Sequence, residues 1–239
     1  MIKVLFICHG NICRSPMAEF CLKNMVTRAG LGQDFEIASA ATSSDELGNG
    51  VYPPARRKLS EHGIDCAGKT ARRIRAQDYD DYDLLLGFDQ ANLRNMQRCF
   101  GGDPEGKLHL MTEYIGAPER IIDDPWYTRD FDTAWEDIEV CCLGLLNALC
   151  PQVTLDFSRC RERGELYDVL AARMLWQNWY GRNLDALYDI LTGLPHLGKC
   201  FVLRLPAEDA PCRGYAEIIG QVFSDAGTEV SVEESNMIL

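Results

Sequence analysis

Fourteen residues decide the fold of the first part of the chain: Lys3-Val-Leu-Phe-Ile-Cys8-His-Gly-Asn-Ile-Cys-Arg14-Ser-Pro16. The apolar run that ends at Cys8 predicts a buried β-strand. Gly10 permits a tight loop directly after that strand. Pro16 suits the first turn of a helix, because a backbone N–H has no partner there in any case. The stretch therefore predicts a strand, a short loop and a helix in immediate succession.

Beyond this stretch, strand-like and helix-like patterns alternate along the first 150 residues. Such alternation is typical of a doubly wound α/β fold, in which helices cover both faces of a parallel sheet. Ligands of such sheets bind beyond the carboxyl ends of the strands, and the loop after Cys8 lies at that position. The four expected strands are 3–8, 35–39, 82–88 and 107–111, and the expected helices are 16–26, 54–62, 90–98 and 131–149.

A domain boundary is predicted at Cys150-Pro151, where a helix-like segment meets a helix breaker. After it the alternation restarts. Strands are expected at 152–157, 200–205 and 228–232, and helices at 162–175, 184–191 and 215–226. We therefore divide the chain into domains 1–150 and 151–239.

Composition and charge narrow the functional classes. The chain has 239 residues, of which 46% are hydrophobic and 25% charged, as in soluble globular proteins. Its net charge is −12. An acidic protein gains no affinity for nucleic acid from counterion release, whereas a basic protein is a matched partner. The apolar run 4–8 is too short to cross a membrane, and we find no secretory signal, so we expect a cytoplasmic location.

The chain contains eleven cysteines. It is long and apolar enough to fold without a disulfide framework. No Cys-x-x-Cys pair stands opposite a second such pair or a His-x-x-x-His group, so we expect no structural zinc site, no other metal and no cofactor. Most of the cysteines are interpreted as small buried hydrophobic residues. Cys8 and Cys13 are the exceptions.

The loop after the first strand has the pattern Cys-x5-Arg-Ser. Five residues between Cys8 and Arg14 can close a loop whose backbone N–H groups point inward and bind an anion. The dipole of the following helix acts in the same direction, so both favour a nucleophilic thiolate at Cys8. Arg14 can hold two phosphate oxygens at once. Ser15 can donate to the sulfur, and Asn11 can lock the loop. The pattern predicts phosphate chemistry by a thiolate.

These residues resemble the low-molecular-weight protein tyrosine phosphatases, and the resemblance covers residues 2–149. It implies hydrolysis of phosphotyrosine in a protein substrate through a cysteinyl-phosphate intermediate. It also implies phosphate binding and loop support by His9, Gly10, Asn11, Ile12, Cys13 and Ser15. Further shared segments are Ser39-Ala-Ala-Thr42, Glu46-Leu-Gly-Asn49, His62-Gly-Ile64, Phe88-Asp-Gln-Ala-Asn-Leu93 and Ile122-Asp-Asp-Pro-Trp-Tyr127.

The resemblance assigns roles outside the loop as well. Asp124 matches the general acid, which protonates the leaving tyrosine oxygen and then activates water; Asp123 beside it is the competing candidate. Asp89 matches the residue that orients the loop arginine. Trp126 and Tyr127 match the aromatic wall of the substrate slot, and core packing is the competing interpretation of Trp126.

Several positions depart from the family pattern. His9 stands where many relatives have an apolar residue, and Asp45 stands where the variable wall carries an aromatic residue. Lys69 falls near a histidine that supports the loop. Ile12 stands where phosphoarginine-specific relatives tend to carry threonine, which favours phosphotyrosine. Cys13 matches a cysteine that can pair with the nucleophile, so we expect peroxide to inactivate the enzyme reversibly through a disulfide.

Two alternatives remain for the first domain. Arsenate reduction on the same loop needs two further cysteines close together after the third strand, and only Cys99 lies in that region. An inactive phosphatase domain that carries an inhibitor is the other alternative. The intact set of Cys8, Arg14 and Asp124 argues against it.

The second domain contains Asn178-Trp-Tyr-Gly-Arg-Asn-Leu-Asp-Ala-Leu-Tyr-Asp189. This run resembles barstar, the intracellular ribonuclease inhibitor, and the resemblance covers residues 152–234. It implies a small α/β domain with a three-stranded parallel sheet that binds a basic ribonuclease-like protein. The residues carried over by position as partner contacts are Trp179, Asp185, Asp189 and Asp225.

The acidic residues of this surface repel one another. Asp185 and Asp189 are four residues apart and share a helix face, so a cationic partner would offset their repulsion. Arg182 lies among these acids. A solvated acidic face without a partner is the competing interpretation.

Overall fold

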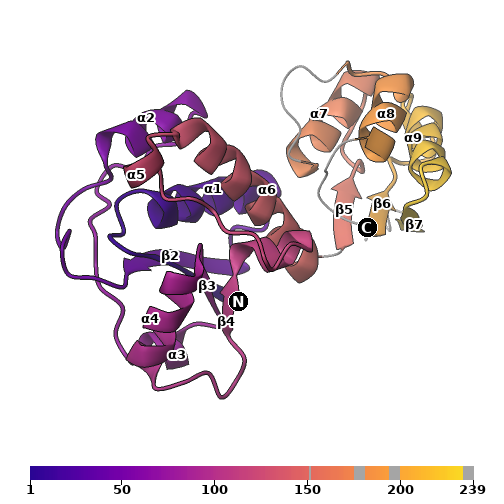
Figure 1. The fold of residues 1–239 in the computed structure, drawn as a ribbon. Helices are drawn as coiled ribbons and strands as arrows, with labels where there is room; N and C mark the ends of the chain where they lie inside the picture. Colours follow the sequence, from indigo (N-terminus) through magenta and orange to yellow (C-terminus); the bar gives the residue numbers. More distant parts are fainter. Residues whose placement is uncertain (151, 175–180, 194–199, 234–239) are drawn as a thin grey trace. The chain divides into compact units, whose positions relative to one another are not determined.

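The computed structural model describes residues 1–150, 152–174, 181–193 and 200–233. They form two compact units: the first comprises residues 1–27 and 31–145, and the second comprises residues 28–30 and 146–239. Each unit contains its own parallel sheet (Figure 1). Within the described ranges, none of the helices has the length and apolar character that crossing a membrane requires.

Four parallel strands form the sheet of the first unit, in the order β2–β1–β3–β4. They are β1 (Ile2–Cys8), β2 (Phe35–Ala41), β3 (Leu84–Gly87) and β4 (Leu108–Leu110). This sheet confirms the doubly wound α/β fold expected from the sequence. The strand order reverses direction next to β1, and in such folds the ligand crevice opens at this switch point. Cys8, the last residue of β1, lies at that position.

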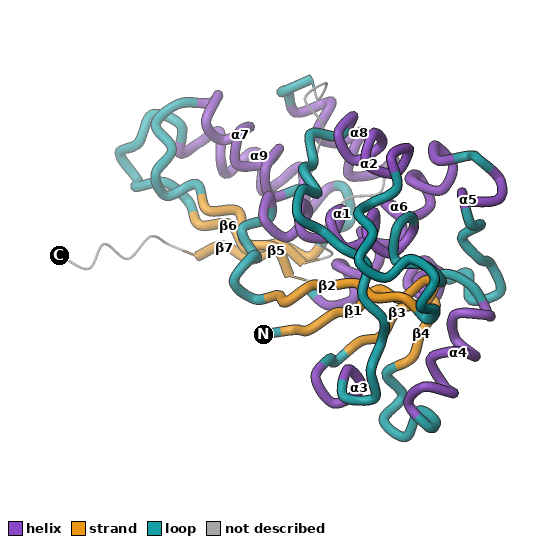
Figure 2. The backbone as a smooth tube through the Cα atoms, turned by 90° about the vertical axis from the view of Figure 1, so that its left-hand side faces the viewer, coloured by secondary structure: helices purple, strands orange, loops and turns teal. Residues whose placement is uncertain are grey.

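Helices cover both faces of this sheet (Figures 1 and 2). On one side lie α1 (Arg14–Arg28), α2 (Pro53–Glu61) and α6 (Phe131–Leu149), and on the other lie α3 (Asp78–Asp81) and α4 (Gln90–Phe100). Two short helices, η1 (Met111–Ile115, a 3-10 helix) and α5 (Pro125–Thr128), belong to the segment between β4 and α6. The sequence did not predict α3, η1 or α5, because four or five residues are too few to show helical periodicity.

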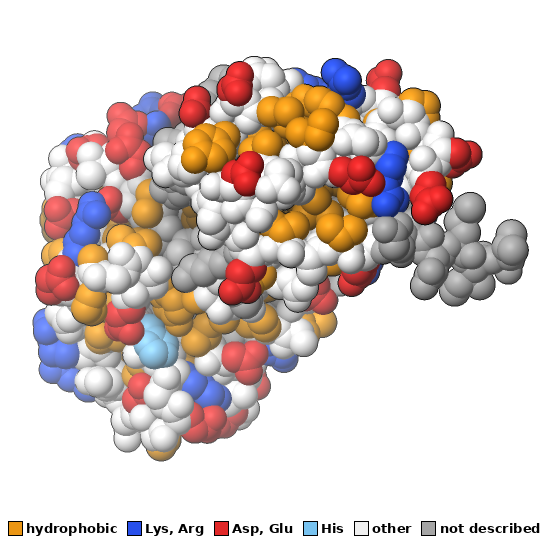
Figure 3. Space-filling model, turned by 90° about the vertical axis from the view of Figure 1, so that its right-hand side faces the viewer, with side chains coloured by type: hydrophobic (Ala, Val, Ile, Leu, Met, Phe, Trp, Pro, Cys, Tyr) orange, Lys and Arg blue, Asp and Glu red, His pale blue; other side chains and the backbone are white. Residues whose placement is uncertain are grey.

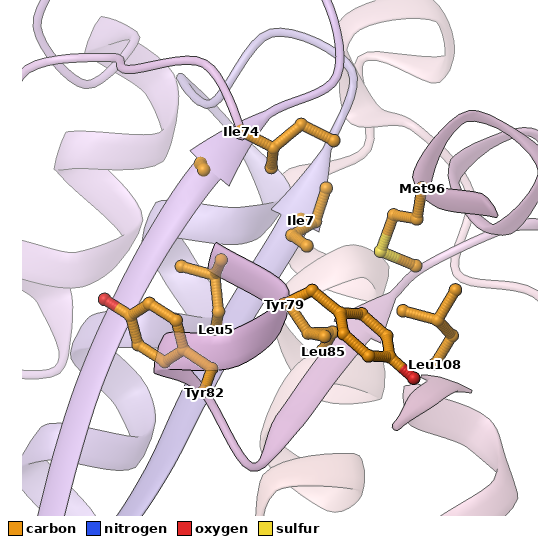
Figure 4. Close-up of a cluster of buried hydrophobic side chains, with 9 residues drawn as sticks. Leu5, Ile7, Ile74, Tyr79, Tyr82, Leu85, Met96 and Leu108 are labelled. Atoms are coloured by element: carbon orange, nitrogen blue, oxygen red, sulfur yellow. The ribbon is translucent and has the colours of Figure 1, made fainter. Parts of the chain in front are cut away.

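Strand β1 is buried on both faces of the sheet. Successive side chains of a strand point to opposite faces, so neighbouring residues of β1 show the burial of each face. Leu5 and Ile7 pack in a cluster that includes Met96 of α4 (Figure 4). Val4 and Phe6 are fully buried as well. Residues 4–8 of this central parallel strand are therefore all apolar and buried, which is why β1 could be recognised from the sequence.

Three parallel strands form the sheet of the second unit, in the order β5–β6–β7. The strands are β5 (Gln152–Asp156), β6 (Cys200–Arg204) and β7 (Glu229–Glu233), and the helices are α7 (Arg163–Arg173), α8 (Leu184–Gly193) and α9 (Arg213–Asp225). The helices lie on one side of the sheet (Figures 1 and 2). In the core between them, the rings of Phe201 and Phe223 are 4.5 Å apart. This sheet confirms the three-stranded parallel sheet expected for the C-terminal part.

Candidate active site

The loop between β1 and α1 surrounds the sulfur of Cys8. The Ser15 hydroxyl lies 3.0 Å from Cys8 Sγ, and the backbone N–H of Asn11 donates to the same sulfur at 3.3 Å. Cys8 is almost fully buried. Negative charge on this sulfur would therefore be stabilised by two hydrogen bonds and by the N-terminal end of α1, which begins at Arg14.

Neighbouring segments hold the carbonyl groups of this loop. The carbonyls of Cys8, His9 and Ile12 accept backbone hydrogen bonds from Thr42, Ser43 and Tyr52, at 2.8, 3.0 and 2.9 Å. These bonds direct the carbonyl oxygens toward the segment after β2. The N–H groups of the same peptide planes are thereby free to face the opposite direction, which is the arrangement of an anion nest.

Asn11 fixes the loop in a conformation that most residues avoid. Its φ is 58°, in the left-handed region, which Asn tolerates better than other residues with a Cβ atom. Its buried amide donates to Ser15 Oγ at 2.9 Å and to Ser39 Oγ at 2.7 Å, and its carbonyl accepts from the backbone N–H of Arg72 at 3.1 Å. Gly10 has a different role, because it allows the loop to approach Glu46 closely. A Cβ atom at position 10 would lie only 3.2 Å from Glu46 Cγ.

The buried carboxylate of Glu19, paired with lysine side chains, supports the loop through Ser39. Ser39 donates to Glu19 Oε2 at 2.5 Å, and that carboxylate pairs with Lys69 and Lys23, both at 2.6 Å. Burial alone would raise the pKa of Glu19, but the two lysines and the Ser39 hydroxyl outweigh it and lower the pKa below its ordinary value. From the sequence we placed Lys69 near the loop but assigned no role to Glu19. The only indication of its role in the sequence is that it is a charged residue on a helix that packs inward.

Arg14 is buried, and most of its hydrogen-bonding groups are satisfied within the first unit. Nη1 donates to Asp89 Oδ2 at 2.7 Å and to the Ile122 carbonyl at 3.0 Å, and Nη2 donates to Asp124 Oδ2 at 2.6 Å. Its Nε is buried and has no hydrogen-bond acceptor among the residues that the structure describes. Burial opposes the charge of Arg14, but Cys8, Asp124 and Asp89 outweigh burial and raise the pKa of the guanidinium.

Both carboxylates on Arg14 are fixed at helix N-termini. Asp89 Oδ1 accepts the backbone N–H of Asn92 at the start of α4, at 2.7 Å. Asp124 Oδ1 accepts the backbone N–H of Trp126 at the start of α5, at 3.1 Å. In each case the second oxygen contacts Arg14. An Asp followed by Pro at the first helical position was a local signal for α5 that could have predicted this helix.

The sulfur of Cys8 faces a cavity of about 200 Å³. Trp126 and Tyr127 form one wall of this slot, and both are exposed, so Trp126 is not a core residue. The ring of Tyr52 lies 4.9 Å behind Trp126; the sequence analysis missed this supporting residue. The residues that line the slot are Cys8, His9, Gly10, Ile12, Cys13, Asp45, Glu46, Asp124, Trp126 and Tyr127.

The structure therefore gathers the expected site residues at one place. Asn11, Arg14, Ser15 and Asp89 lie directly behind the slot. Asp123 differs from Asp124, because it is exposed and is not among the residues that line the slot; both aspartates line an adjoining cleft. Among the described residues, no group of three or more His, Cys, Asp or Glu side chains could hold a metal ion.

In the second unit, α8 presents an acidic face to solvent. Asp185 and Asp189 are exposed, and Tyr188 between them is 44% exposed; the sequence analysis missed this tyrosine. Arg182 pairs with Asp168 of α7 at 2.8 Å, which holds its charge on α7. Asp225 at the end of α9 is exposed and accepts a hydrogen bond from Gln221 at 2.7 Å. Trp179 lies outside the described residues.

Two family models match different parts of the chain. Residues 150–239 match the family model described as barstar (barnase inhibitor). The low molecular weight phosphotyrosine protein phosphatase of chicken (Gallus gallus) is 37% identical over 148 residues, which are 60% of this chain and 93% of that relative.

Solved structures resemble the same part of the chain. YfkJ from Bacillus subtilis is 31% identical with a TM-score of 0.60, and the match covers 62% of this chain and 94% of YfkJ. A Drosophila arginine phosphatase is 33% identical with a TM-score of 0.58, covering 62% of this chain and 98% of that one. Residues 3–155, well over half of the sequence, match the family model described as low molecular weight phosphotyrosine protein phosphatase. The chain thus belongs to the low molecular weight phosphotyrosine protein phosphatase family.

Proposed function

We propose that this protein hydrolyses phosphotyrosine in other proteins, with Cys8 as nucleophile, Arg14 as phosphate ligand and Asp124 as general acid. One observation supports the proposal most strongly: buried Arg14 has an unpartnered Nε–H, and its Nη2 contacts Asp124, which lines the slot together with Cys8. A buried donor without an acceptor is costly. A phosphate oxygen in the slot would supply the missing acceptor.

Arg14 is suited to bidentate phosphate binding. Its Nη1 stays on Asp89 and the Ile122 carbonyl, which fixes the plane of the guanidinium. Nε and Nη2 then form a fork that matches two phosphate oxygens. The incoming phosphate displaces Asp124 from Nη2, and the released carboxyl can carry the proton that the leaving group needs.

The reaction then has two steps. The Cys8 thiolate attacks phosphorus, the bond to the tyrosine oxygen breaks, and Asp124 transfers its proton to that oxygen. In the second step, Asp124 takes a proton from water while the water oxygen attacks phosphorus. The bond to Cys8 breaks, and the Ser15 hydroxyl, 3.0 Å from the sulfur, stabilises the departing thiolate.

An aryl substrate fits this slot because one wall is aromatic. Trp126 and Tyr127 can stack on the tyrosine ring while the phosphate reaches Cys8. Phosphoarginine is the second candidate, because one similar structure is an arginine phosphatase. Ile12 adds an apolar surface to the slot, which favours the ring.

Turnover of matched peptides tests the proposal. Peptides that carry phosphotyrosine or phosphoarginine in the same sequence are incubated with the full-length protein, and Cys8→Ser serves as the control. We expect the tyrosine peptide to be hydrolysed at a higher kcat/KM and the variant to be inactive. Preference for phosphoarginine, or no turnover of either peptide between about pH 5 and 7, would contradict it.

We further propose that domain 1–150 carries the chemistry and that domain 151–239 binds a basic protein of the ribonuclease type. The barstar family match and the exposed Asp185, Tyr188 and Asp189 support this role. Acidic and apolar side chains also stand beside one another on the face shown in Figure 3. An aromatic ring between two carboxylates suits a cationic partner surface.

Inhibition of a ribonuclease tests this second role. The full-length protein is titrated into barnase, and RNA cleavage is measured for wild type and for Asp189→Lys. We expect wild type to inhibit cleavage and the variant to inhibit at least tenfold more weakly, because the variant opposes a basic partner. If wild type leaves cleavage unchanged, a barnase-like partner is excluded.

A further inference from the structure

The mouth of the slot carries charges that the chemistry above does not use. Asp45 and Glu46 lie on the loop between β2 and α2 and line the slot with Cys8. The imidazole of His9 meets this loop, with Nε2 lying 3.1 Å from Asp45 Oδ2. The His9 and Asp45 side chains are 55% and 71% exposed, so both stand at the entrance.

The lining of the slot is acidic. Its lining residues include Asp45, Glu46 and Asp124 and no Lys or Arg. Buried Arg14, the proposed phosphate ligand, pairs with Asp124, so the carboxylates of Asp45 and Glu46 account for the charge at the entrance. Within the part of the chain that the structure describes, neither Asp45 nor Glu46 forms an ion pair with a Lys or Arg side chain. Arg73 lies beside this loop and donates to the Ser44 hydroxyl at 3.4 Å. Its charge is thus near the entrance but is not paired with either carboxylate.

The opposite wall differs in charge. There Arg129 lies over the ring of Trp126, 5.4 Å from its centroid, and donates to the Tyr52 hydroxyl at 3.3 Å. The entrance therefore has an acidic side at Asp45 and an aromatic side at Trp126. A cationic group of a bound peptide would be attracted to the first side.

We propose that His9 and Asp45 make this active site select phosphotyrosine that has a lysine or arginine next to it in the substrate. This inference rests on the proposed phosphatase function and adds a sequence preference to it. A phosphotyrosine dianion must pass the carboxylates of the entrance to reach Cys8. A neighbouring cation in the peptide turns that repulsion into attraction.

Peptide geometry permits this contact. When the tyrosine ring fills the slot, the peptide backbone lies at the entrance. Flanking residues in an extended chain are about 3.5 Å apart along the backbone, so a lysine one or two positions away can reach the rim. His9 assists by holding Asp45 at the entrance through the 3.1 Å contact. An apolar residue at position 9 would leave that carboxylate unrestrained.

Three phosphotyrosyl peptides that differ only in their flanking residues test the inference. The tyrosine is flanked on both sides by Lys, by Gln or by Glu, and kcat/KM is measured with the full-length protein at low and at physiological salt. For wild type we expect the Lys peptide to exceed the Gln peptide about three- to fivefold, the size expected for one exposed charge pair, and the Glu peptide to be the poorest. The preference should shrink as salt increases.

Charge variants assign the preference to Asp45. We expect Asp45→Asn to bring the Lys-to-Gln ratio close to one and Asp45→Lys to reverse it. Asp34→Lys is the matched control: this exposed residue precedes β2, at the opposite end of the strand, and should keep the wild-type ratio. Because each ratio is measured within one protein, a change in the amount of folded enzyme cancels.

The outcomes separate this inference from the function on which it rests. If wild type fails to hydrolyse p-nitrophenyl phosphate and all three peptides, the proposed function fails. If wild type hydrolyses p-nitrophenyl phosphate but treats the peptides alike, or prefers Glu, the charge selection is overturned. The same holds if Asp34→Lys changes the ratio as much as Asp45→Lys does.

Discussion

Arg14 Nη2 donates to Asp124 Oδ2 at 2.6 Å. In our proposal, the phosphate ligand and the general acid thus bind each other before either can act on a substrate. Arg14 is 2% exposed and Asp124 is 19% exposed, so solvent screens this ion pair only weakly. A phosphate group that binds Arg14 must displace the Asp124 carboxylate from it. Part of the attraction between Arg14 and the substrate is therefore offset by the loss of Asp124.

Replacing Asp124 should consequently separate binding from chemistry. In Asp124→Asn we expect kcat for an aryl phosphate to fall about 10²- to 10⁴-fold, the usual effect of losing a general acid. We expect inorganic phosphate to inhibit this variant more strongly than wild type, since no carboxylate competes for Nη2. Asp123→Asn is the matched control and should change both constants less than about threefold. A larger loss of kcat in Asp123→Asn than in Asp124→Asn would show that Asp123, and not Asp124, is the general acid.

The ion pair beneath the loop predicts a dependence of stability on pH. The pKa of Glu19 lies below its ordinary value of 4.5 in the folded protein. Its stabilising effect is therefore fully present above pH 4.5 and is lost as the pH falls through the lower, folded-state pKa. We expect Glu19→Gln to cost about 3 kcal/mol of unfolding free energy near pH 7. This difference from wild type should narrow steadily below pH 4.5.

An exposed ion pair provides the control for that measurement. Glu36 pairs with Lys3 at 3.4 Å, and both side chains are nearly half exposed, so Glu36→Gln should cost at most about 1 kcal/mol. Denaturant unfolding of each variant between pH 3 and 7 measures both effects. Equal costs for the two variants would mean that the Glu19 pair does not stabilise the first unit.

The sequence predicted those parts of the site that are local. Cys8, Arg14 and Ser15 lie within eight consecutive residues, so their strand, loop and helix follow from a short pattern, and the fold confirms these elements. Glu19 was missed because its role depends on Ser39 and Lys69, which come from distant segments. No local pattern indicates which buried charge will meet which partner.

The same limit applies to the entrance and to the second unit. Asp45 could be recognised as a departure from the family pattern, but its contact with His9 joins residues 36 positions apart. Tyr188 was missed, because only its exposure distinguishes it from core residues of the same helix such as Leu187. Arg182 was placed among the acidic residues, whereas the structure directs its side chain to Asp168.

Cys13 provides a test of redox control. It lines the slot with Cys8 and is buried. Burial, followed by the charges of Cys8 and Asp124, raises the pKa of the Cys13 thiol well above its ordinary value. Cys13 is thus a protonated neighbour rather than a competing nucleophile. Oxidation of the Cys8 thiolate by hydrogen peroxide gives a neutral sulfenic acid and a hydroxide ion. This reaction removes one of these charges from the slot and favours attack by Cys13.

That attack forms a Cys8–Cys13 disulfide and releases water, and a thiol reductant restores both thiols. We expect wild type treated with peroxide to regain most of its activity in dithiothreitol. Cys13→Ser should regain little, because the sulfenic acid is then oxidised further and irreversibly. Cys99→Ser, a half-buried cysteine of α4, is the control and should recover like wild type. Full recovery of Cys13→Ser would exclude the disulfide.

Removal of the second domain tests how the two parts divide the function. The residues that we propose for catalysis all precede residue 128, and the chicken relative matches this chain over 93% of its own length. A chain that ends at residue 150 keeps the four strands of the first sheet and helix α6. We therefore expect it to hydrolyse p-nitrophenyl phosphate with nearly the kcat/KM of the full-length protein. A loss of more than about tenfold, or about 1.4 kcal/mol of transition-state stabilisation, would show that the second domain contributes to chemistry. Circular dichroism of the shortened chain distinguishes such a contribution from simple unfolding.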